Sequence, residues 1–359
     1  MFPGALAGTG DPRSAARDRS GRWVALRSAG SCRGPEGAGP GAADVAANGP
    51  RREPRESDTR GSFDAGHTGS GRAARRHRPG WAGSSRNASC ALWSERELAR
   101  AATAEDDLDA AQENKLRRLA QLAGVHAGMD VLEVGSGFGG MLDHLVETAG
   151  ARSAHGLEPD PEMCRYVKQH AGPGVSVENI GWEDFVPDRR FDAVVGVSVL
   201  EYAARSPSPS PQEEIDALRE FFRRAHTWTV PAASLVQEVT IAGPAGLSEK
   251  SAQGERNVGE DLGAPPGKPP ELSHVLTAAR GLWELVSVET HRHAWARTMD
   301  VWLARARRIP HPAVEWQAQF LDASQRYFEL ERDLLLTGER SVAHLAFRRL
   351  DGHGADSAT

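Results

Sequence analysis

The sequence predicts an α/β fold built on a doubly wound, parallel β-sheet. First, short apolar segments alternate with helical segments from residue 110 to residue 241, which is the order that produces strands joined by covering helices. Second, segment 191–200 is almost continuously apolar, as is typical of a strand buried on both faces. Third, a glycine-rich turn at residues 135–140 separates an apolar strand from a helical pattern.

The elements follow in order from periodicity and from helix signals. Leu116, Leu119 and Leu122 recur at helical spacing within residues 110–122, which predicts a helix there. Pro161 opens a second helix, because proline fits a first helical turn. Strands are predicted at 130–134, 153–158, 175–179, 191–200, 234–241, 282–289 and 341–348, and further helices at 213–224, 272–279, 298–308 and 314–336.

Composition divides the chain into one folded domain and two tails. Residues 1–85 are rich in Gly, Ala, Arg, Pro and Ser and show no apolar periodicity, so we expect a disordered leader. The folded domain is expected at 91–349, followed by a disordered tail at 350–359. Within the domain, the polar and Gly/Pro-rich segment 242–272 predicts a loop or mobile lid.

Bulk properties exclude several classes of function. The net charge of −6 does not favour nucleic acid as a partner. No apolar stretch approaches the roughly 20 residues of a transmembrane segment, and no signal peptide is recognisable. The three cysteines are widely separated, without disulfide or zinc spacing. These features predict a cytoplasmic protein, and they leave a homodimer open.

The glycine turn predicts a bound cofactor but does not by itself identify it. Gly135, Gly137 and Gly140 fit the dinucleotide pattern G-x-G-x-x-G. Gly135, Gly137 and Gly139 fit the G-x-G-x-G of S-adenosylmethionine (SAM) methyltransferases. A plain strand-to-helix turn without a ligand is the third interpretation.

Residues after the neighbouring strands favour SAM. Glu133 and Glu158 end the first two strands, at the sheet edge where α/β proteins bind ligands. A carboxylate in the position of Glu158 suits a ribose in either cofactor. Trp182 and Glu183 follow the third strand and offer a stacking face and an acceptor for an adenine.

The chain resembles the cyclopropane-fatty-acid synthase family of SAM-dependent methyltransferases over about residues 91–349. That family includes mycolic-acid and some small-molecule methyltransferases. Besides the glycine turn, which is generic to methyltransferases, the shared segments are Trp93-Ser94, the helix segment 111–116, Gly181-Trp182-Glu183, the strand that ends at Leu200-Glu201, and Ala296-Arg297-Thr298 with Trp302. The helix segment with Gln112, Gly181-Trp182-Glu183 and Ala296-Arg297-Thr298 are together much more specific.

The resemblance implies a class I SAM-dependent methyltransferase fold with a helical lid over the acceptor pocket. It also implies roles for individual residues in binding SAM. Ser94, Gly135 and Gly137 would hold the amino-acid end, with help from Gln112, and Trp93 lies beside Ser94 in the predicted cofactor site. Glu158 would bind the ribose, Trp182 and Glu183 the adenine, and Met163 would border the pocket. Glu133 and Gly139 complete the predicted cofactor site.

The catalytic positions depart from the family pattern. Cyclopropane synthases hold a bicarbonate with Glu, His and Tyr; the Glu is matched here by Glu201. Gln237 takes the place of the His, unless a one-residue offset puts Glu238 there, and Trp295 takes the place of the Tyr. Losing two of three ligands argues against bicarbonate as a cofactor and against cyclopropanation of membrane lipids.

The acceptor is therefore expected to be a small molecule methylated at carbon or nitrogen, with a lipid as the alternative. Tyr202 and Trp295 would form the acceptor wall, and Tyr327 is a further candidate. A metal site is not expected, because His291 and His293 lack a third ligand in the sequence. Two other classes stay open: a non-catalytic SAM-binding partner protein and an NAD oxidoreductase.

Overall fold

The computed structural model describes residues 15–17, 23–25, 86–203, 210–262 and 269–351. The chain divides into two compact units, Ala7–Arg75 and the remainder, Met1–Leu6 with Arg76–Thr359. In the smaller unit, β1 (Ala15–Arg17) pairs antiparallel with β2 (Trp23–Ala25). Apart from these strands, the predicted leader at 1–85 lies outside the described residues, as does most of the predicted tail at 350–359.

The larger unit is built on a seven-stranded sheet in the order β5-β4-β3-β6-β7-β9-β8. The first five of these strands run parallel, whereas β9 pairs antiparallel with both β7 and β8. The predicted parallel, doubly wound sheet is confirmed for the first five strands, whereas the antiparallel edge was not predicted, because apolar periodicity carries no information on strand direction. The strands are β3 (Asp130–Val134), β4 (Ser153–Leu157), β5 (Val175–Glu178), β6 (Phe191–Val197), β7 (Thr229–Ala242), β8 (Trp283–Thr290) and β9 (Arg340–Arg349).

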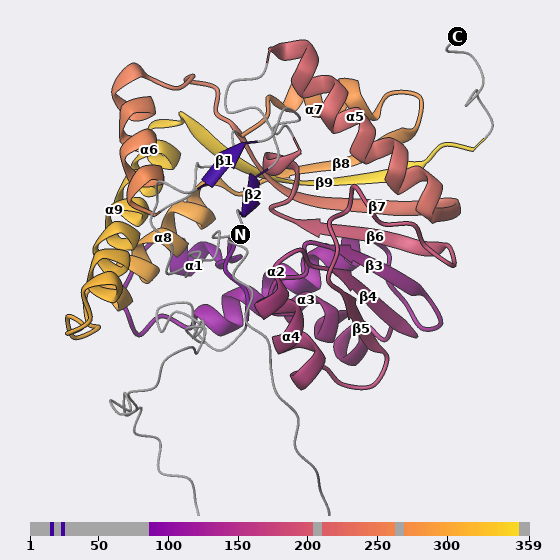
Figure 1. Cartoon of the computed structure of the whole chain (residues 1–359), viewed down its shortest axis with the longest axis horizontal. Coiled ribbons are helices and arrows are strands. Elements are labelled where there is room, and N and C mark those ends of the chain that lie inside the picture. Colours follow the sequence, from indigo (N-terminus) through magenta and orange to yellow (C-terminus); the bar gives the residue numbers. More distant parts are fainter. Residues whose placement is uncertain (1–14, 18–22, 26–85, 204–209, 263–268, 352–359) are drawn as a thin grey trace, which may run out of the picture. The chain divides into compact units, whose positions relative to one another are not determined.

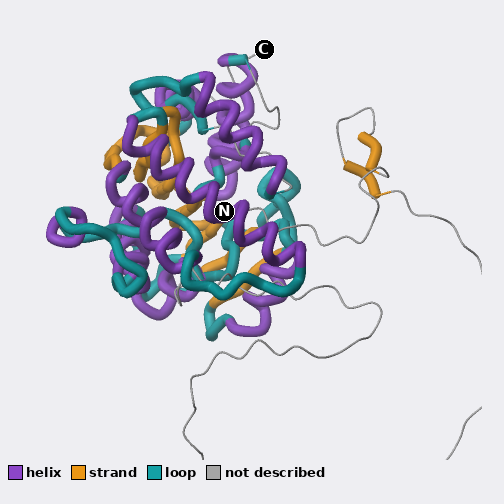
Figure 2. Tube along the Cα trace, turned by 90° about the vertical axis from the view of Figure 1, so that its left-hand side faces the viewer, coloured by secondary structure: helices purple, strands orange, loops and turns teal. Residues whose placement is uncertain are grey.

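Helices cover both faces of the sheet, and Figure 2 shows the strands of this unit enclosed by them. On one face, α5 and α7 pack against apolar residues of β3, β6, β7 and β9; on the other, α2, α3 and α4 do so. The α-helices before residue 230 are α1 (Glu95–Leu98), α2 (Leu108–Leu122), α3 (Gly140–Asp143), α4 (Pro161–His170) and α5 (Pro211–Trp228). The later ones are α6 (Glu249–Asp261), α7 (Leu272–Ala279), α8 (Arg292–Ala306) and α9 (Glu315–Thr337).

Local sequence accounts for several of these boundaries. Asp160 caps α4 by accepting hydrogen bonds from the backbone of Glu162 and Met163, with Pro161 at the first helical position. Ser210 and Glu213 form a reciprocal capping box at the start of α5. The predicted strand 191–200 ends earlier, at Val197, because Ser198 has a φ of 54° and extended pairing cannot continue through a left-handed residue.

A third apolar cluster joins α8 and α9 to the segment that precedes α1. Buried residues from these helices pack with Cys90, Trp93 and Leu108. Helix α6 lies against α9 in the same region (Figure 1). This helical layer brings the motif at Ala296-Arg297-Thr298 next to Trp93, far from it in sequence.

Segment 242–272, predicted to be a loop or mobile lid, contains the helix α6. The Ser248 hydroxyl caps its first turn by accepting a hydrogen bond from Ser251 N, and Gly254 lets the helix approach α9. A Cβ atom at Gly254 would lie 3.2 Å from a methyl group of Leu330. Residues 263–268 lie outside the described part.

Within the described ranges, no helix combines the length and the apolar character that crossing a membrane requires.

Candidate active site

The glycine turn after β3 has the backbone that its sequence predicts. Gly135, Gly137 and Gly139 have φ values of 73°, 55° and 80°, which residues with a Cβ rarely adopt. The N–H groups of Gly135 and Ser136 both donate to Leu157 O, at 2.8 and 3.1 Å. The turn is thus fixed to the end of β4, and its last glycine begins α3.

We predict that Gly139→Ala destabilises the protein by about 1–3 kcal/mol. Its added Cβ would combine a left-handed backbone with a contact at 3.0 Å to a Val167 methyl group. Gly246→Ala is the matched control, because Gly246 has a φ of +70° and nothing lies within 4 Å of the built Cβ. Urea unfolding should show the larger loss for Gly139→Ala, and equal losses would contradict the role of the Val167 contact.

Glu158 connects the ends of β4 and β3 directly. Its carboxylate accepts hydrogen bonds from Gly137 N at 2.7 Å and from Asp160 N at 2.9 Å. The side chain is buried, and this burial raises the pKa of Glu158 above its usual range, against the lowering effect of the two N–H donors. Glu158, the residue predicted to bind the ribose, is therefore joined directly to the glycine turn by a hydrogen bond.

The predicted adenine segment lies beside Glu158 and the glycine turn. Asn179, after β5, donates to Glu158 O at 2.8 Å, which holds the loop after β5 against the end of β4. Trp182 is partly buried and meets Phe221 edge to face, with ring centroids 5.4 Å apart. Met163 lies at the start of α4, whose Val167 contacts the glycine turn.

A buried polar group lies beneath the glycine turn, on the face covered by α2. Gln112 Nε2 donates to Ser89 O at 2.8 Å, and Lys115 Nζ donates to Ser89 Oγ at 2.6 Å. Glu133 is 2% exposed. Burial raises its pKa well above the usual range, and the charge of Lys115 opposes this shift. Lys115 was missed by sequence reasoning, although its spacing of three from Gln112 places both on one helix face.

Three buried polar atoms here have no hydrogen-bond partner among the described residues: Gln112 Oε1, Glu133 Oε2 and Ser136 Oγ. Buried polar atoms are normally paired, because leaving one unpaired costs about 1–3 kcal/mol. Ser136 belongs to the glycine turn and Glu133 lies two residues before it, which fits a polar ligand there. All three oxygens can accept a hydrogen bond.

The Trp93-Ser94 pair is split between two environments. Trp93 is buried, donates from Nε1 to Thr298 Oγ1 at 3.0 Å, and lies under the Arg297 guanidinium at 5.1 Å. Ser94 is exposed and caps α1, with its hydroxyl bonded to Glu97 at 2.7 Å. The structure therefore joins the two predicted family motifs through Trp93, while the role of Ser94 toward SAM stays a prediction.

Glu201 lies just after β6, in the short 3₁₀ helix Leu200–Tyr202. Its Oε1 accepts a hydrogen bond from Thr240 N at 2.6 Å, and Oε2 has no hydrogen-bond partner among the described residues. Burial raises the pKa of this carboxyl above its usual range. The left-handed backbone of Ser198 turns the chain toward Glu201, and such strain is frequent at functional sites.

Gln237 and Glu238 occupy opposite faces of β7, because successive strand residues alternate. Gln237 is fully buried and lies opposite Gly196 of β6. A Cβ atom on Gly196 would overlap the Gln237 amide. Glu238 faces α2 and bonds His344 at 2.9 Å. A one-residue offset would put Glu238 in the place of the family's histidine. The Glu238 carboxylate, however, lies with His344 on the face of β7 opposite to Gln237.

Aromatic and charged residues gather around Glu201. Trp295 is buried on α8 and meets Trp302 edge to face at 5.2 Å. Glu331 of α9, 2% exposed, pairs with Arg340, which also pairs with Glu255. Sequence reasoning missed Glu331 and Arg340, because their distance in sequence from Glu201 leaves no local signal.

The charges in this group influence one another. Burial raises the pKa of Glu331 to about 8, and the Glu201 carboxylate adds to the shift. Burial also lowers the pKa of Arg340 to about 10, although Glu201 and Tyr202 oppose this. The Arg340 guanidinium interacts with three carboxylates, those of Glu201, Glu255 and Glu331. Protonation of Glu331 therefore relieves the excess negative charge. Tyr202 and Tyr327 belong to the same electrostatic group.

We predict that the free energy of unfolding falls as pH rises from about 5 to about 8 through the contribution of Glu331. In this window Glu331 is deprotonated in the unfolded chain, where its pKa is near 4.3, but is still protonated in the folded chain. Because the folded state binds the extra proton, its free energy of unfolding falls as the pH rises. Glu331→Gln should flatten this part of the profile, measured by urea unfolding across the window. An unchanged slope in the variant would contradict the raised pKa.

The order of the strands brings these pieces to one edge of the sheet. The loops after β3, β4, β5 and β6 all leave from carboxyl ends of neighbouring parallel strands, and the polar groups above lie in or beside them. A glycine turn, a buried carboxylate and an adjacent acidic loop thus share the edge of the sheet at which open α/β folds bind ligands.

The family model for mycolic acid cyclopropane synthetase matches residues 79–344, and the chain belongs to this family. This membership places it among the SAM-dependent methyltransferases and favours SAM over NAD at the glycine turn. The tuberculostearic acid methyltransferase UfaA1 of Mycobacterium tuberculosis is 34% identical over 120 residues, or 32% of this chain. The chain matches only 26% of that relative's length.

Solved structures share the fold at low sequence identity. The cyclopropane synthase MmaA2 from Mycobacterium tuberculosis has a TM-score of 0.63 at 19% identity, covering 74% of this chain and 90% of its own. The mycolic acid cyclopropane synthase CmaA1, complexed with SAH and CTAB, has a TM-score of 0.61 at 20% identity, covering 75% and 92%. Coclaurine N-methyltransferase, bound to N-methylheliamine and SAH, has a TM-score of 0.57 at 16% identity, covering 75% and 79%.

Proposed function

We propose that this protein transfers the methyl group of SAM to a carbon or nitrogen atom of a small-molecule acceptor, without closing a cyclopropane ring. The observation that carries the proposal is the environment of Glu201. The carboxylate is retained, but Gln237 and Trp295 stand where the family pattern has His and Tyr, and Glu331 and Arg340 add charge nearby.

The residues of the glycine-turn edge suit SAM. Glu133 Oε2 and Gln112 Oε1 are unpaired acceptors of the kind that an ammonium group needs, and Ser136 Oγ offers a hydroxyl beside them. Glu158 would exchange a backbone partner for ribose hydroxyls, and Trp182 with Glu183 would take the adenine. When bound, SAM supplies a methyl group on a sulfonium centre.

The protein's own part in such a transfer is to position the acceptor and to accept a proton. An in-line displacement needs the acceptor atom about 3 Å from the methyl carbon, in a site that excludes water. Glu201 has one oxygen fixed by Thr240 N and one without a described partner. That second oxygen can accept a proton from the methylated product and stabilise its positive charge.

Bicarbonate does not fit this group of residues. The Gln237 amide cannot take up a proton and is packed against Gly196, and Trp295 offers an indole N–H instead of a hydroxyl. We therefore assign no step to bicarbonate.

Deuterium-labelled SAM separates the proposed reaction from cyclopropanation. The full chain is incubated with SAM carrying a fully deuterated methyl group and with amines, small alkenes or phospholipid vesicles. Mass spectrometry of the product should show a methyl group that keeps every deuterium, in the small-molecule fractions. A lipid product that has lost one deuterium per transfer would overturn the proposal, because ring closure removes a hydrogen from the methyl carbon.

Methylation of a lipid chain is the second candidate, favoured by the family itself and by the name of the tuberculostearic acid relative. In the same assay it would give a methylated lipid, which keeps every deuterium where the intermediate cation loses its proton from a chain carbon and not from the transferred methyl group. That result would retain methyl transfer without ring closure and would reject the small-molecule acceptor.

A further inference from the structure

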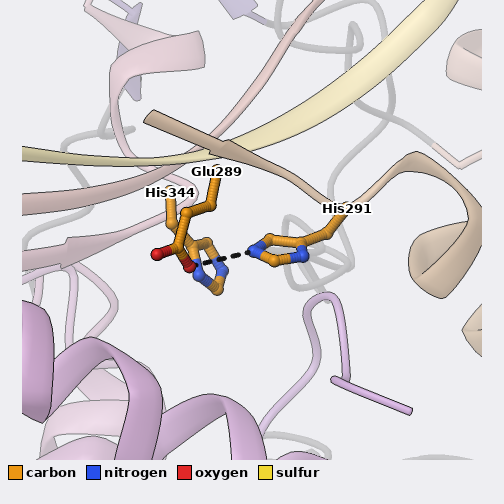
Figure 3. A group of neighbouring side chains, drawn as sticks. All are labelled: Glu289, His291 and His344. Atoms are coloured by element: carbon orange, nitrogen blue, oxygen red, sulfur yellow. Dashed lines mark ion pairs between the residues drawn. The ribbon is translucent and has the colours of Figure 1, made fainter. Parts of the chain in front are cut away.

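A group of metal-binding residue types lies where β8, α8 and β9 meet. Glu289 is near the end of β8, His291 directly precedes α8, and His344 is on β9. Glu289 and His344 are direct partners in the antiparallel register, so their side chains share one face. One ligand atom from each of the three residues lies within 4.8 Å of the others (Figure 3).

Two imidazole nitrogens in this group are buried without a hydrogen-bond partner among the described residues. They are Nδ1 of His344 and Nε2 of His291. The centroids of the two imidazole rings are 4.4 Å apart. His344 is fully buried. Two histidines that served only to satisfy each other or the sheet would use these nitrogens in hydrogen bonds, because burying unpaired polar atoms is costly.

Glu238 supplies the support that metal-bound histidines usually have. Its carboxylate lies 2.9 Å from His344 Nε2. This contact favours the tautomer with the proton on Nε2, which leaves a lone pair on Nδ1. Glu238 thus orients the imidazole from behind, on the side away from its unpaired nitrogen.

We propose that His344 Nδ1, His291 Nε2 and the Glu289 carboxylate bind a divalent first-row transition metal ion, with Zn²⁺ as the best match. Two imidazoles and a carboxylate are a common zinc ligand set. His291 Nε2 lies 3.7 Å from Glu289 Oε2, close to the roughly 3.4 Å that separates ligands around a tetrahedral zinc ion. Small side-chain rotations would complete the site.

Arg118 sets the main electrostatic condition on this site. It contacts both Glu289 oxygens, with Nε at 2.9 Å from Oε2, and neutralises that carboxylate. A carboxylate has about four lone-pair positions and can serve a guanidinium and a metal ion together. The second carboxylate, Glu238, offsets the added positive charge from the other side of His344.

The consequence of the bound ion is structural. It would fasten the start of α8, which carries Trp295 and the Ala296-Arg297-Thr298 motif, to strands β8 and β9. The expectation that no metal binds rested on the lack of a third ligand near His291 and His293. In the folded chain, Glu289 and His344 supply two ligands beside His291, whereas His293 is exposed.

The test is direct metal binding by the full chain after chelator treatment. Zn²⁺ is titrated by calorimetry, and Co²⁺ is added as a spectroscopic probe of histidine ligands. His291→Ala and Glu289→Gln replace partly exposed ligands, so both variants should fold. His293→Ala is the matched control, because it removes a histidine two residues away and leaves every other histidine of the chain in place.

We expect one ion per chain for the unaltered protein and for His293→Ala, with binding at least about tenfold weaker in His291→Ala and Glu289→Gln. The Co²⁺ spectrum should change in the same two variants only. Absence of saturable binding in the unaltered protein, or equal binding in His291→Ala and His293→Ala, would overturn the proposal. SAM binding measured on the same samples reports separately on the proposed function.

Discussion

Glu201→Gln should lower turnover by about 10²–10⁴-fold, the range expected for loss of a positioned proton acceptor. Its affinity for SAM should stay within about threefold, because an uncharged amide leaves the glycine-turn edge intact and can still accept the hydrogen bond from Thr240 N. Single-turnover rates with labelled SAM give the first quantity, and calorimetry gives the second.

Glu284→Gln is the matched control for this change, because Glu284 is an exposed glutamate on β8. It should leave both quantities unchanged. An equal loss of turnover and of SAM affinity in Glu201→Gln would contradict its assignment to the acceptor side.

Glu158→Ala should weaken SAM binding and leave turnover at saturating SAM nearly unchanged, the reverse of Glu201→Gln. Removing its carboxylate deletes the predicted ribose contacts and leaves the N–H groups of Gly137 and Asp160 without their acceptor. Hydrogen bonds to a charged group contribute about 1.5–3 kcal/mol each, so the Kd for SAM should rise by about 10–100-fold. At saturating SAM, kcat should stay within about threefold of the unaltered enzyme.

Calorimetry at several SAM concentrations and rates at saturation measure these two effects separately. Glu178→Ala, at the exposed end of β5, serves as the control and should bind SAM normally. If Glu158→Ala kept its SAM affinity, the ribose role of Glu158 would be wrong.

Much of the fold could be predicted because its signals are local. The strand at 130–134 and the helix at 272–279 have the predicted bounds. Most other elements differ only at their ends, for example α5, which extends from Pro211 to Trp228. Glycine turns and apolar periodicity depend on neighbouring residues, so a single sequence reveals them.

The missed features all depend on residues that are distant in sequence. The direction of β9, the pairing of Glu331 with Arg340, and the meeting of His344 with Glu289 arise only when the sheet forms. Lys115 is a different case, because a buried lysine inside a polar helix segment looks like any solvated one. A sequence predicts the nucleotide-binding edge better than the acceptor side, since only the former is built from consecutive residues.

The position of β9 has a consequence for how the protein is made. Strand β9 lies between β7 and β8, but it follows both in the chain, after α8 and α9. During synthesis, β7 and β8 therefore emerge with edges that nothing else in the sheet can pair, and exposed edges promote association with other chains. The same strand carries Arg340, so the charge balance around Glu201 is established only when it inserts. A ribosome-bound chain that lacks β9 would therefore be prone to aggregation.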